Sequence, residues 1–116
     1  MKESISLIMP VRNAQLTLAD QVSHVLEILS DMSTQFELVI VDDASTDGTE
    51  EVAHELTQIY PQIQFIRHAK QMGSRAAVRT GMERANADIV LVEGESDSYD
   101  GLPAKIAPVD QPEDVS

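Results

Sequence analysis

The strongest constraint on the fold is the segment 37–41, whose apolar residues run directly into Asp42 and Asp43. Consecutive apolar residues indicate a strand of a parallel sheet, because helices cover both faces of such a strand. Asp47 then stands three residues before Glu50, which is the spacing of a helix N-cap and its capping-box acid. The segment therefore predicts a buried strand, a turn and a helix. Since ligands of open α/β sheets bind at the carboxyl ends of the strands, the two acids mark a candidate ligand site.

The rest of the chain repeats this alternation of strand and helix. We expect further strands over residues 5–9, 62–67 and 88–92, with Pro10 ending the first, and helices over 14–29, from Asp47 to Pro61 and from Gly73 onward. The apolar residues of each helix recur at the spacing of one helical face. The residues expected to face the core are Leu18, Val22, Val25, Leu26 and Leu29, then Val52, Ala53, Leu56 and Ile59, then Ala77, Val78, Met82 and Ala85.

Strands that alternate with helices predict βαβ units with right-handed crossovers. The expected fold class is therefore α/β, a three-layer α/β/α Rossmann-like domain with a mainly parallel sheet of about four strands. We assign this domain to residues 1–97 and treat residues 98–116 as an acidic, proline-containing tail. The 116 residues are enough for one hydrophobic core and too few for two.

Charge and composition exclude several classes of function. The formal net charge is −12, and from Ala87 onward eight acids are accompanied by Lys105 alone. Such a chain repels nucleic acids and anionic membranes, so we expect no nucleic-acid partner. The absence of cysteine excludes disulfides and thiolate-bound zinc. The sequence has no apolar run long enough for a membrane span and no apolar signal-peptide region near Met1, so we expect a cytoplasmic protein.

Polar residues follow each of the four predicted strands. They are Pro10 to Asn13 after the first, Asp42 and Asp43 after the second, Arg67 and His68 after the third, and Glu93 and Glu95 after the fourth. Carboxylates, guanidinium groups and backbone amides that converge on one edge of a sheet can contact a base, hold a ribose and neutralise a diphosphate. The sequence therefore predicts a ligand site at this edge.

Four segments resemble family 2 glycosyltransferases, in the expected order and spacing. Residues 6–13 look like the family's opening strand, which is followed by Pro, any residue, an aromatic, Asn and Glu. Residues 38–49 are close to its second signature, an apolar strand followed by Asp-Asp-Gly-Ser-Thr-Asp-Gly-Thr. Residues 73–81 are similar to its Gly-rich helix start, and residues 88–92 to the strand before its metal motif. The resemblance covers about residues 4–97.

The resemblance implies a GT-A fold and the nucleotide-binding half of a transferase that moves a hexose from a UDP- or GDP-linked sugar. It implies that Asp43 contacts the base, that Asp42 lies near the ribose and that Arg75 faces the nucleotide. The residues expected to bind the nucleotide are Pro10, Val11, Arg12, Asn13, Asp42, Asp43, Ser45, Gly73 and Arg75.

The chain departs from the family pattern at the expected metal site. The family's fourth strand runs into Asp-x-Asp, which holds Mg²⁺ or Mn²⁺ against the diphosphate, because hard cations prefer carboxylate oxygens. This chain has Glu93-Gly94-Glu95, which begins one residue early. Glu93 and Glu95 are therefore candidate metal ligands. In the usual register Gly94 and Ser96 would take the two positions, and the acids would form a solvated turn without a metal.

Two further departures concern the first loop and the length. Arg12 stands where the family has an aromatic residue, and Ala14 replaces its Glu, although an arginine can also stack on a base or pair with a phosphate. Only about twenty residues follow the expected metal motif, whereas the family's acceptor site and general base lie well downstream of it. We therefore name no catalytic residue and expect weak or no transfer by this chain alone. We expect a partner that supplies the acceptor half, or a homodimer.

Two other readings of the sequence belong to different functional classes. In the first, the chain is a structural or regulatory protein that dimerises through an uncovered edge of its fourth strand. In the second, it is a phospho-acceptor receiver, but receivers carry their acid pair after the first strand. We expect the three histidines at the surface, although His68 follows the third strand closely enough to approach a phosphate.

Overall fold

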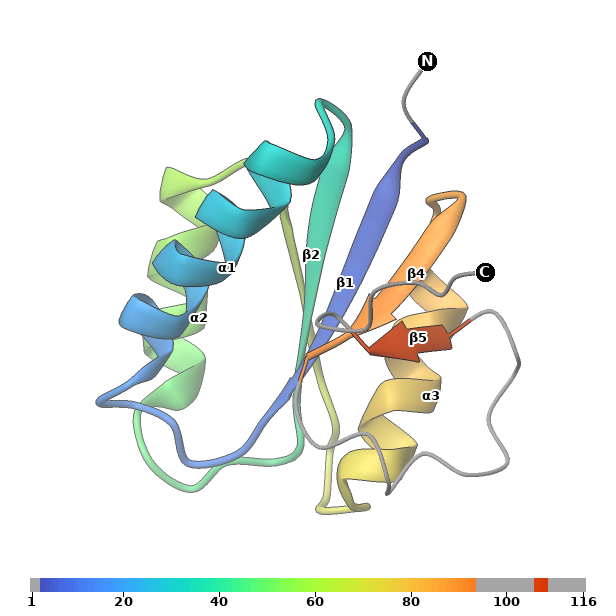
Figure 1. The fold of residues 1–116 in the computed structure, drawn as a ribbon. Helices are drawn as coiled ribbons and strands as arrows, with labels where there is room; N and C mark the ends of the chain where they lie inside the picture. The colour runs from blue at the N-terminus through green and yellow to red at the C-terminus, as the bar shows by residue number, and fades with distance from the viewer. Residues whose placement is uncertain (1–2, 94–105, 109–116) are drawn as a thin grey trace.

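The computed structural model describes residues 3–93 and 106–108. Its strands form one sheet in the order β3-β2-β1-β4-β5, and every neighbouring pair is parallel. The strands are β1 (Ile5–Val11), β2 (Phe36–Asp42), β3 (Ile63–Arg67), β4 (Ile89–Val92) and β5 (Ile106–Pro108), and the helices are α1 (Leu18–Met32), α2 (Thr49–Ile59) and α3 (Ser74–Arg84). Figure 1 shows α1 and α2 on one side of the sheet and α3 on the other, which confirms the three-layer α/β architecture.

The core has two parts, because successive side chains of a strand point to opposite faces of the sheet. Leu7 and Met9 of β1 pack with the buried residues of α1 and α2, whereas Ile8 between them packs with Ala77 of α3. A Cβ at Gly81 of α3 would lie 2.5 Å from Cγ2 of Ile8, so the glycine lets this helix approach the sheet closely. Each face of β1 is therefore covered, as the continuous apolar sequence predicts.

The helix stripes are largely as expected. All five residues predicted to face the core from α1 are buried. The helix begins later than predicted, at Leu18, because the residues from Ala14 onward form a turn. In this turn the carbonyl of Ala14 accepts a hydrogen bond from the N–H of Leu18. In α2 the prediction is wrong at Ile59, which is 63% exposed. This residue ends the helix, and α2 packs over β3, an edge strand that leaves the last turn with few neighbours.

The expected capping box of α2 does not form. The N-cap is Gly48, and Asp47 instead accepts hydrogen bonds from the N–H and the hydroxyl of Thr49. The carboxylate of Glu50 lies 3.7 Å from Nε of Arg67 and 3.7 Å from Nε2 of His54. It therefore contacts these two side chains and does not cap the start of its helix. The helix still begins and ends within two residues of the prediction.

The strands differ from the expected pattern at two points, and the prediction that Pro10 ends the first strand is wrong. β1 continues through Pro10 to Val11, because its pairing with β4 stops at Ile8 and only the pairing with β2 continues. A proline is tolerated where a strand has one neighbour. The sheet also has a fifth strand, β5, which pairs with β4 over Val90–Val92 and lies along the edge that the structural or regulatory alternative took as uncovered. The remaining residues of the predicted tail, 98–105 and 109–116, lie outside the described residues, and the domain boundary stays a prediction.

No helix in the described part of the chain combines the length and the apolar character that a membrane span requires.

Candidate functional site

The sheet has a topological switch point beside β1. From β1 the chain moves outward to β2 and β3, and it then returns to β4 on the other side of β1. β1 pairs with β2 as far as Val11 but with β4 only as far as Ile8, so the two neighbours diverge at the carboxyl end. The loops that follow β1, β2 and β3 lie together along this end, at the lower edge of the sheet in Figure 1. Open α/β sheets bind their ligands in such a crevice.

A pocket of about 260 Å³ lies at this switch point, and we call it the edge pocket. It is lined by the end of β1, by the residue after β2 and by the loop that leads into α3: Pro10, Val11, Arg12, Asp43, Gln71, Gly73 and Ser74. A guanidinium group, a carboxylate and the N-terminal end of a helix thus meet around one small cavity. This combination suits a ligand with both an anionic part and hydrogen-bonding groups.

Asp43 is the central polar residue of the edge pocket. It is only 4% exposed, and its carboxylate accepts hydrogen bonds from the backbone N–H groups of Met72 and Gly73, both at 2.8 Å. Nδ1 of His68 lies 2.9 Å from the same carboxylate. Burial alone would raise the pKa of Asp43, but the bonds from His68 and the two amides outweigh it, so the pKa lies below its ordinary value. Asp43 is therefore an ionised carboxylate at the wall of the pocket.

His68 is buried, and the expectation that it lies on a surface loop is wrong. The ring is 8% exposed, with Nδ1 on Asp43 and Nε2 at 2.8 Å from the hydroxyl of Thr80 in α3. The N–H of His68 donates to the carbonyl of Asp42, which extends the contact between β2 and β3 by one residue and directs the ring inward. His24 and His54 lie on exposed helix surfaces, as predicted.

Asp42 is used differently from its neighbour, because consecutive residues at a strand end point to opposite sides. It is fully buried and accepts from NH1 of Arg67 at 2.7 Å. Its other oxygen accepts from the N–H and the hydroxyl of Ser45, and NH2 of Arg67 donates to the carbonyl of Ser45. Asp42, Ser45 and Arg67 therefore brace the loop after β2.

Asn13 joins the loop after β1 to the same brace. Its N–H donates to the hydroxyl of Ser45 at 2.7 Å, and its side-chain oxygen accepts from the N–H of Thr46 at 2.9 Å. Both loops turn through left-handed backbone, with φ of 53° at Asn13 and 61° at Ala44. Asparagine tolerates this conformation, whereas an alanine adopts it at a cost of about 1 kcal/mol. The two loops are thus held together by specific side chains.

The expected nucleotide-binding residues fall into three groups. Those that line the edge pocket are Pro10, Val11, Arg12, Asp43 and Gly73. Asn13, Asp42 and Ser45 form the adjacent brace, and Arg75 is exposed in the first turn of α3 without lining the pocket. Gln71 and Ser74 line the pocket although the sequence did not single them out. Contact of these residues with a nucleotide stays a prediction.

The expected metal ligands are only partly described. Glu93 follows β4, is half-buried, and its N–H donates to the carbonyl of Ile8 at 2.9 Å. Glu95 lies outside the described residues. Within residues 3–93 and 106–108, no group of three or more His, Asp or Glu side chains gathers that could hold a metal ion. Glu93 contributes a single carboxylate, which by itself does not make a divalent-ion site.

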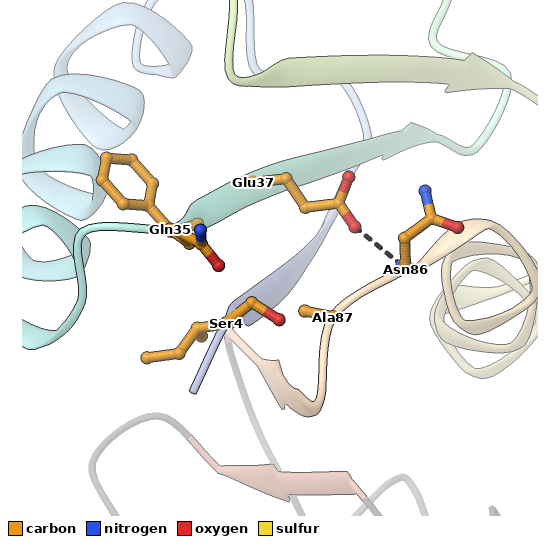
Figure 2. Close-up of a pocket in the computed structure, with 7 residues that line it drawn as sticks. Ser4, Gln35, Glu37, Asn86 and Ala87 are labelled. Atoms are coloured by element: carbon orange, nitrogen blue, oxygen red, sulfur yellow. Dashed lines mark hydrogen bonds between the residues drawn. The ribbon is translucent and has the colours of Figure 1, made fainter. Parts of the chain in front are cut away.

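A second pocket, of about 180 Å³, lies at the opposite, amino edge of the sheet (Figure 2). It is lined by Ser4, Ile5, Gln35, Phe36, Glu37, Asn86 and Ala87. The carboxylate of Glu37 accepts from the N–H of Asn86 at 2.9 Å and from the hydroxyl of Ser6, so it ties the segment before β4 to β1 and β2. This pocket lies away from the switch point and its acids, and we take the edge pocket as the candidate functional site.

Several known proteins that match this chain are glycosyltransferases. The family model described as Glycosyl transferase family 2 matches residues 6–93. A dolichol-phosphate mannosyltransferase of Pyrococcus furiosus is 35% identical over 88 residues, which are 76% of this chain and 24% of that protein. The structure of the mannosyltransferase PcManGT from Pyrobaculum calidifontis, in complex with GDP-Man and Mn²⁺, matches with a TM-score of 0.70 at 24% identity, over 78% of this chain and 26% of that one.

A further solved structure, residues 1–349 of S. aureus TarS in complex with UDP-GlcNAc, matches with a TM-score of 0.67 at 23% identity, over 79% of this chain and 26% of that one. The chain thus spans about a quarter of the length of these three matched chains. The structural likeness shows the GT-A, Rossmann-like fold, and the family model covers the strands β1 to β4 with the loops of the edge pocket. The chain therefore belongs to glycosyltransferase family 2.

Proposed function

We propose that this chain binds the nucleotide part of a nucleotide diphosphate sugar in the edge pocket and forms the donor-binding part of a glycosyltransferase. The observation that carries the proposal is Asp43, a buried, ionised carboxylate held by two backbone amides and a histidine in the wall of a pocket at the switch point. A fixed carboxylate of this kind is an acceptor for the N–H group of a base. The complexes of PcManGT with GDP-Man and of TarS with UDP-GlcNAc support a ligand of this class.

Arg12 supplies the complementary charge in the proposal. It is exposed at the rim of the pocket, at the end of β1. Within the described residues its guanidinium group has no carboxylate within salt-bridge distance, in contrast to Arg67, which is paired with Asp42. An unpaired guanidinium group can stack on the base or pair with the diphosphate.

The hydrogen bonds of Asp43 favour a uracil nucleotide. Oδ1 already accepts from His68 and Met72, whereas Oδ2 accepts from Gly73 alone among the described residues. The carboxylate therefore retains room for one further donor, on Oδ2. Uracil presents a single ring N–H, whereas guanine presents an N–H and an amino group that pair best with both oxygens of one carboxylate. We therefore propose UDP in preference to GDP.

In this proposal, transfer of the sugar requires an acceptor site and a general base in addition to this chain. An acceptor site and a general base would come from the remainder of a longer protein or from a partner, since the chain spans only about a quarter of the length of these two relatives. Glu93 and Glu95 would be the ligands of Mg²⁺ or Mn²⁺, and the proposed binding of the base does not depend on the metal.

Calorimetric titration with UDP and GDP, each with and without Mn²⁺, tests the proposal. We expect UDP to bind, and a saturating concentration of about 100 times Kd to stabilise the protein by about 2.7 kcal/mol. Asp43→Asn should weaken binding by about tenfold or more, because it removes a charged acceptor. Asp31→Asn, which removes an exposed acid of α1, is the matched control and should leave binding unchanged.

The alternatives give different results. Tighter binding of GDP than of UDP would overturn the base assignment and leave donor binding intact. Binding that strengthens with Mn²⁺ would support Glu93 and Glu95 as ligands. A folded protein that binds neither nucleotide, and forms a stable dimer, would favour the structural or regulatory function.

A further inference from the structure

A continuous hydrogen-bonded chain runs from α3 to the wall of the edge pocket. The hydroxyl of Thr80 lies 2.8 Å from Nε2 of His68, and Nδ1 of His68 lies 2.9 Å from Oδ1 of Asp43. His68 is 8% exposed and Asp43 is 4% exposed, so the contact between these two is shielded from solvent, whereas Thr80 is half-buried. His68 itself does not line the pocket. Its two ring nitrogens are both used inside the protein, which points to a role that acts through Asp43.

The partners define which nitrogen of His68 carries the proton. An ionised carboxylate only accepts hydrogen bonds, so Nδ1 must be the donor toward Asp43. In the neutral ring Nε2 then accepts from the hydroxyl of Thr80. The second partner of an imidazole commonly fixes its orientation and tautomer in this way. Thr80 thus orients the ring, and the ring orients the carboxylate.

The orientation of Asp43 controls the loop as well as the ligand acceptor. Oδ1 accepts from both His68 and the N–H of Met72, and Oδ2 accepts from the N–H of Gly73. Gly73 has a φ of 102°, a conformation that the surrounding loop must hold in place. Without the bond from His68, the carboxylate can rotate and exchange its two amide partners. A rotation would move Gly73, and it would turn the acceptor on Oδ2 away from the pocket.

We propose that His68 is a positioning residue for the edge pocket: it saturates Oδ1 of Asp43, holds the loop at Met72–Gly73, and leaves Oδ2 as the acceptor for the ligand. The part that concerns the ligand rests on the proposed function of the pocket. The part that concerns the loop does not, and it can be measured without any ligand.

Two substitutions separate the hydrogen bond from His68 to Asp43 from the one between His68 and Thr80. His68→Asn places an amide nitrogen where Nδ1 lies and keeps the donor to Asp43, but it is too short to reach Thr80. His68→Gln places its amide near Nε2 and keeps the contact with Thr80, but it loses the donor to Asp43. Both variants replace the buried ring by a smaller amide side chain, so a merely structural role predicts similar losses from the two. His24→Gln, on the exposed face of α1, is the matched control.

The first readout is hydrogen exchange at the amides of Met72 and Gly73 in the free protein. We expect His68→Gln to speed exchange at both amides by about tenfold or more, since a charge-assisted bond that holds their acceptor is lost. His68→Asn should affect these amides less, even if urea unfolding shows that both variants are equally destabilised. Equal protection in the two variants, or loss that follows global stability alone, would overturn the proposal.

The second readout is the affinity for UDP, measured by calorimetry. His68→Gln should weaken binding by at least about fivefold more than His68→Asn, and the difference should vanish when both are made on the Asp43→Asn background. A difference that persists without the Asp43 carboxylate would also overturn the proposal. If the unaltered protein binds neither UDP nor GDP, the proposed function fails, and the exchange of the two amides still decides the role of His68.

Discussion

At both edges of the sheet a carboxylate accepts hydrogen bonds from backbone amides, but the two contacts have different roles. At the amino edge, the carboxylate of Glu37 accepts a backbone N–H from the segment before β4 (Figure 2), and at the carboxyl edge Asp43 accepts two from the loop before α3. Glu37 lies within a strand, where β1 and its neighbours are still paired. Asp43 lies beyond the strand ends, where the pairing of β1 with β4 has stopped. The contact between Asp43 and its backbone amides therefore borders an open crevice, and the contact between Glu37 and its backbone amide mainly holds the sheet together.

The backbone conformation also differs between the two edges. The carboxyl edge contains the positive φ angles at Asn13, Ala44 and Gly73, which turn the loops sharply and expose their amides. A carboxylate bound to backbone amides therefore does not by itself mark a ligand site. The site is marked by such a carboxylate at a switch point, next to strand ends that diverge.

The largest expected effect on stability is at the carboxyl edge, from Asp42→Ala. The substitution leaves Arg67 and the N–H of Ser45 without their buried partner, and we expect the free energy of unfolding to fall by about 3 kcal/mol. Urea unfolding measures this loss. Asp31→Ala, on the exposed surface of α1, should change the free energy by no more than about 0.5 kcal/mol. A loss below about 1 kcal/mol would mean that water replaces the brace.

The next effect separates the two edges directly. Glu37→Ala removes the acceptor of the Ser6 hydroxyl and the Asn86 N–H, so we expect a loss of about 2 kcal/mol in unfolding free energy. The affinity for UDP should stay unchanged in calorimetry, in contrast to the weakening expected from Asp43→Asn. If Glu37→Ala weakens UDP binding as much as Asp43→Asn does, the edges are coupled and the comparison fails.

A smaller effect concerns pH. The pKa of Asp43 in the folded protein lies below its ordinary value of 3.8, so the unfolded chain takes up a proton before the folded one does. The stability from this group is therefore fully present above about pH 4 and is lost as the pH falls through the lowered pKa. Unfolding curves between about pH 5 and pH 2 should show a shallower decline for Asp43→Asn than for the unaltered protein. An identical decline would show that Asp43 has the same pKa in both states.

The smallest expected effect is a gain. Ala44 has a φ of 61°, and we expect Ala44→Gly to raise the free energy of unfolding by about 0.5–1 kcal/mol because glycine adopts this conformation without strain. Ala87→Gly at the amino edge is the matched control. Its φ is not positive, so the same substitution should lower stability by about 0.5–1 kcal/mol. Changes of the same sign at both positions would contradict the assigned strain at Ala44.

Much of the fold follows from local patterns. The stripe from Leu18 to Leu29 and the apolar run that ends at Asp42 identify elements that bury one face or two, and those patterns persist in any packing of the elements. The predictions that are wrong concern contacts with a neighbour. Pro10 continues β1 because β2 alone still pairs there, and Glu50 leaves the expected capping box because Arg67 lies beside it. β5 was missed because a three-residue strand carries almost no sequence signal.

The candidate site was predictable in its place but not in its bonding. The sequence put Asp42 and Asp43 together at a strand end, and nothing in their spacing shows that one braces a loop and the other faces a pocket. His68 is the clearest example. Its partners Asp43 and Thr80 are 25 and 12 residues away, and a histidine after a strand has no local pattern that reports burial.

Sequence patterns are enough to identify the α/β alternation, the edge at which the polar residues converge, and the family, because each depends on residues that are adjacent or evenly spaced along the chain. Packing of the whole chain sets the different roles of the two aspartates, the burial of His68 and the position of the edge pocket. These depend on the order of the strands and on where their pairing stops, which brings together groups that are distant in sequence and sets which of their hydrogen bonds are satisfied within the protein.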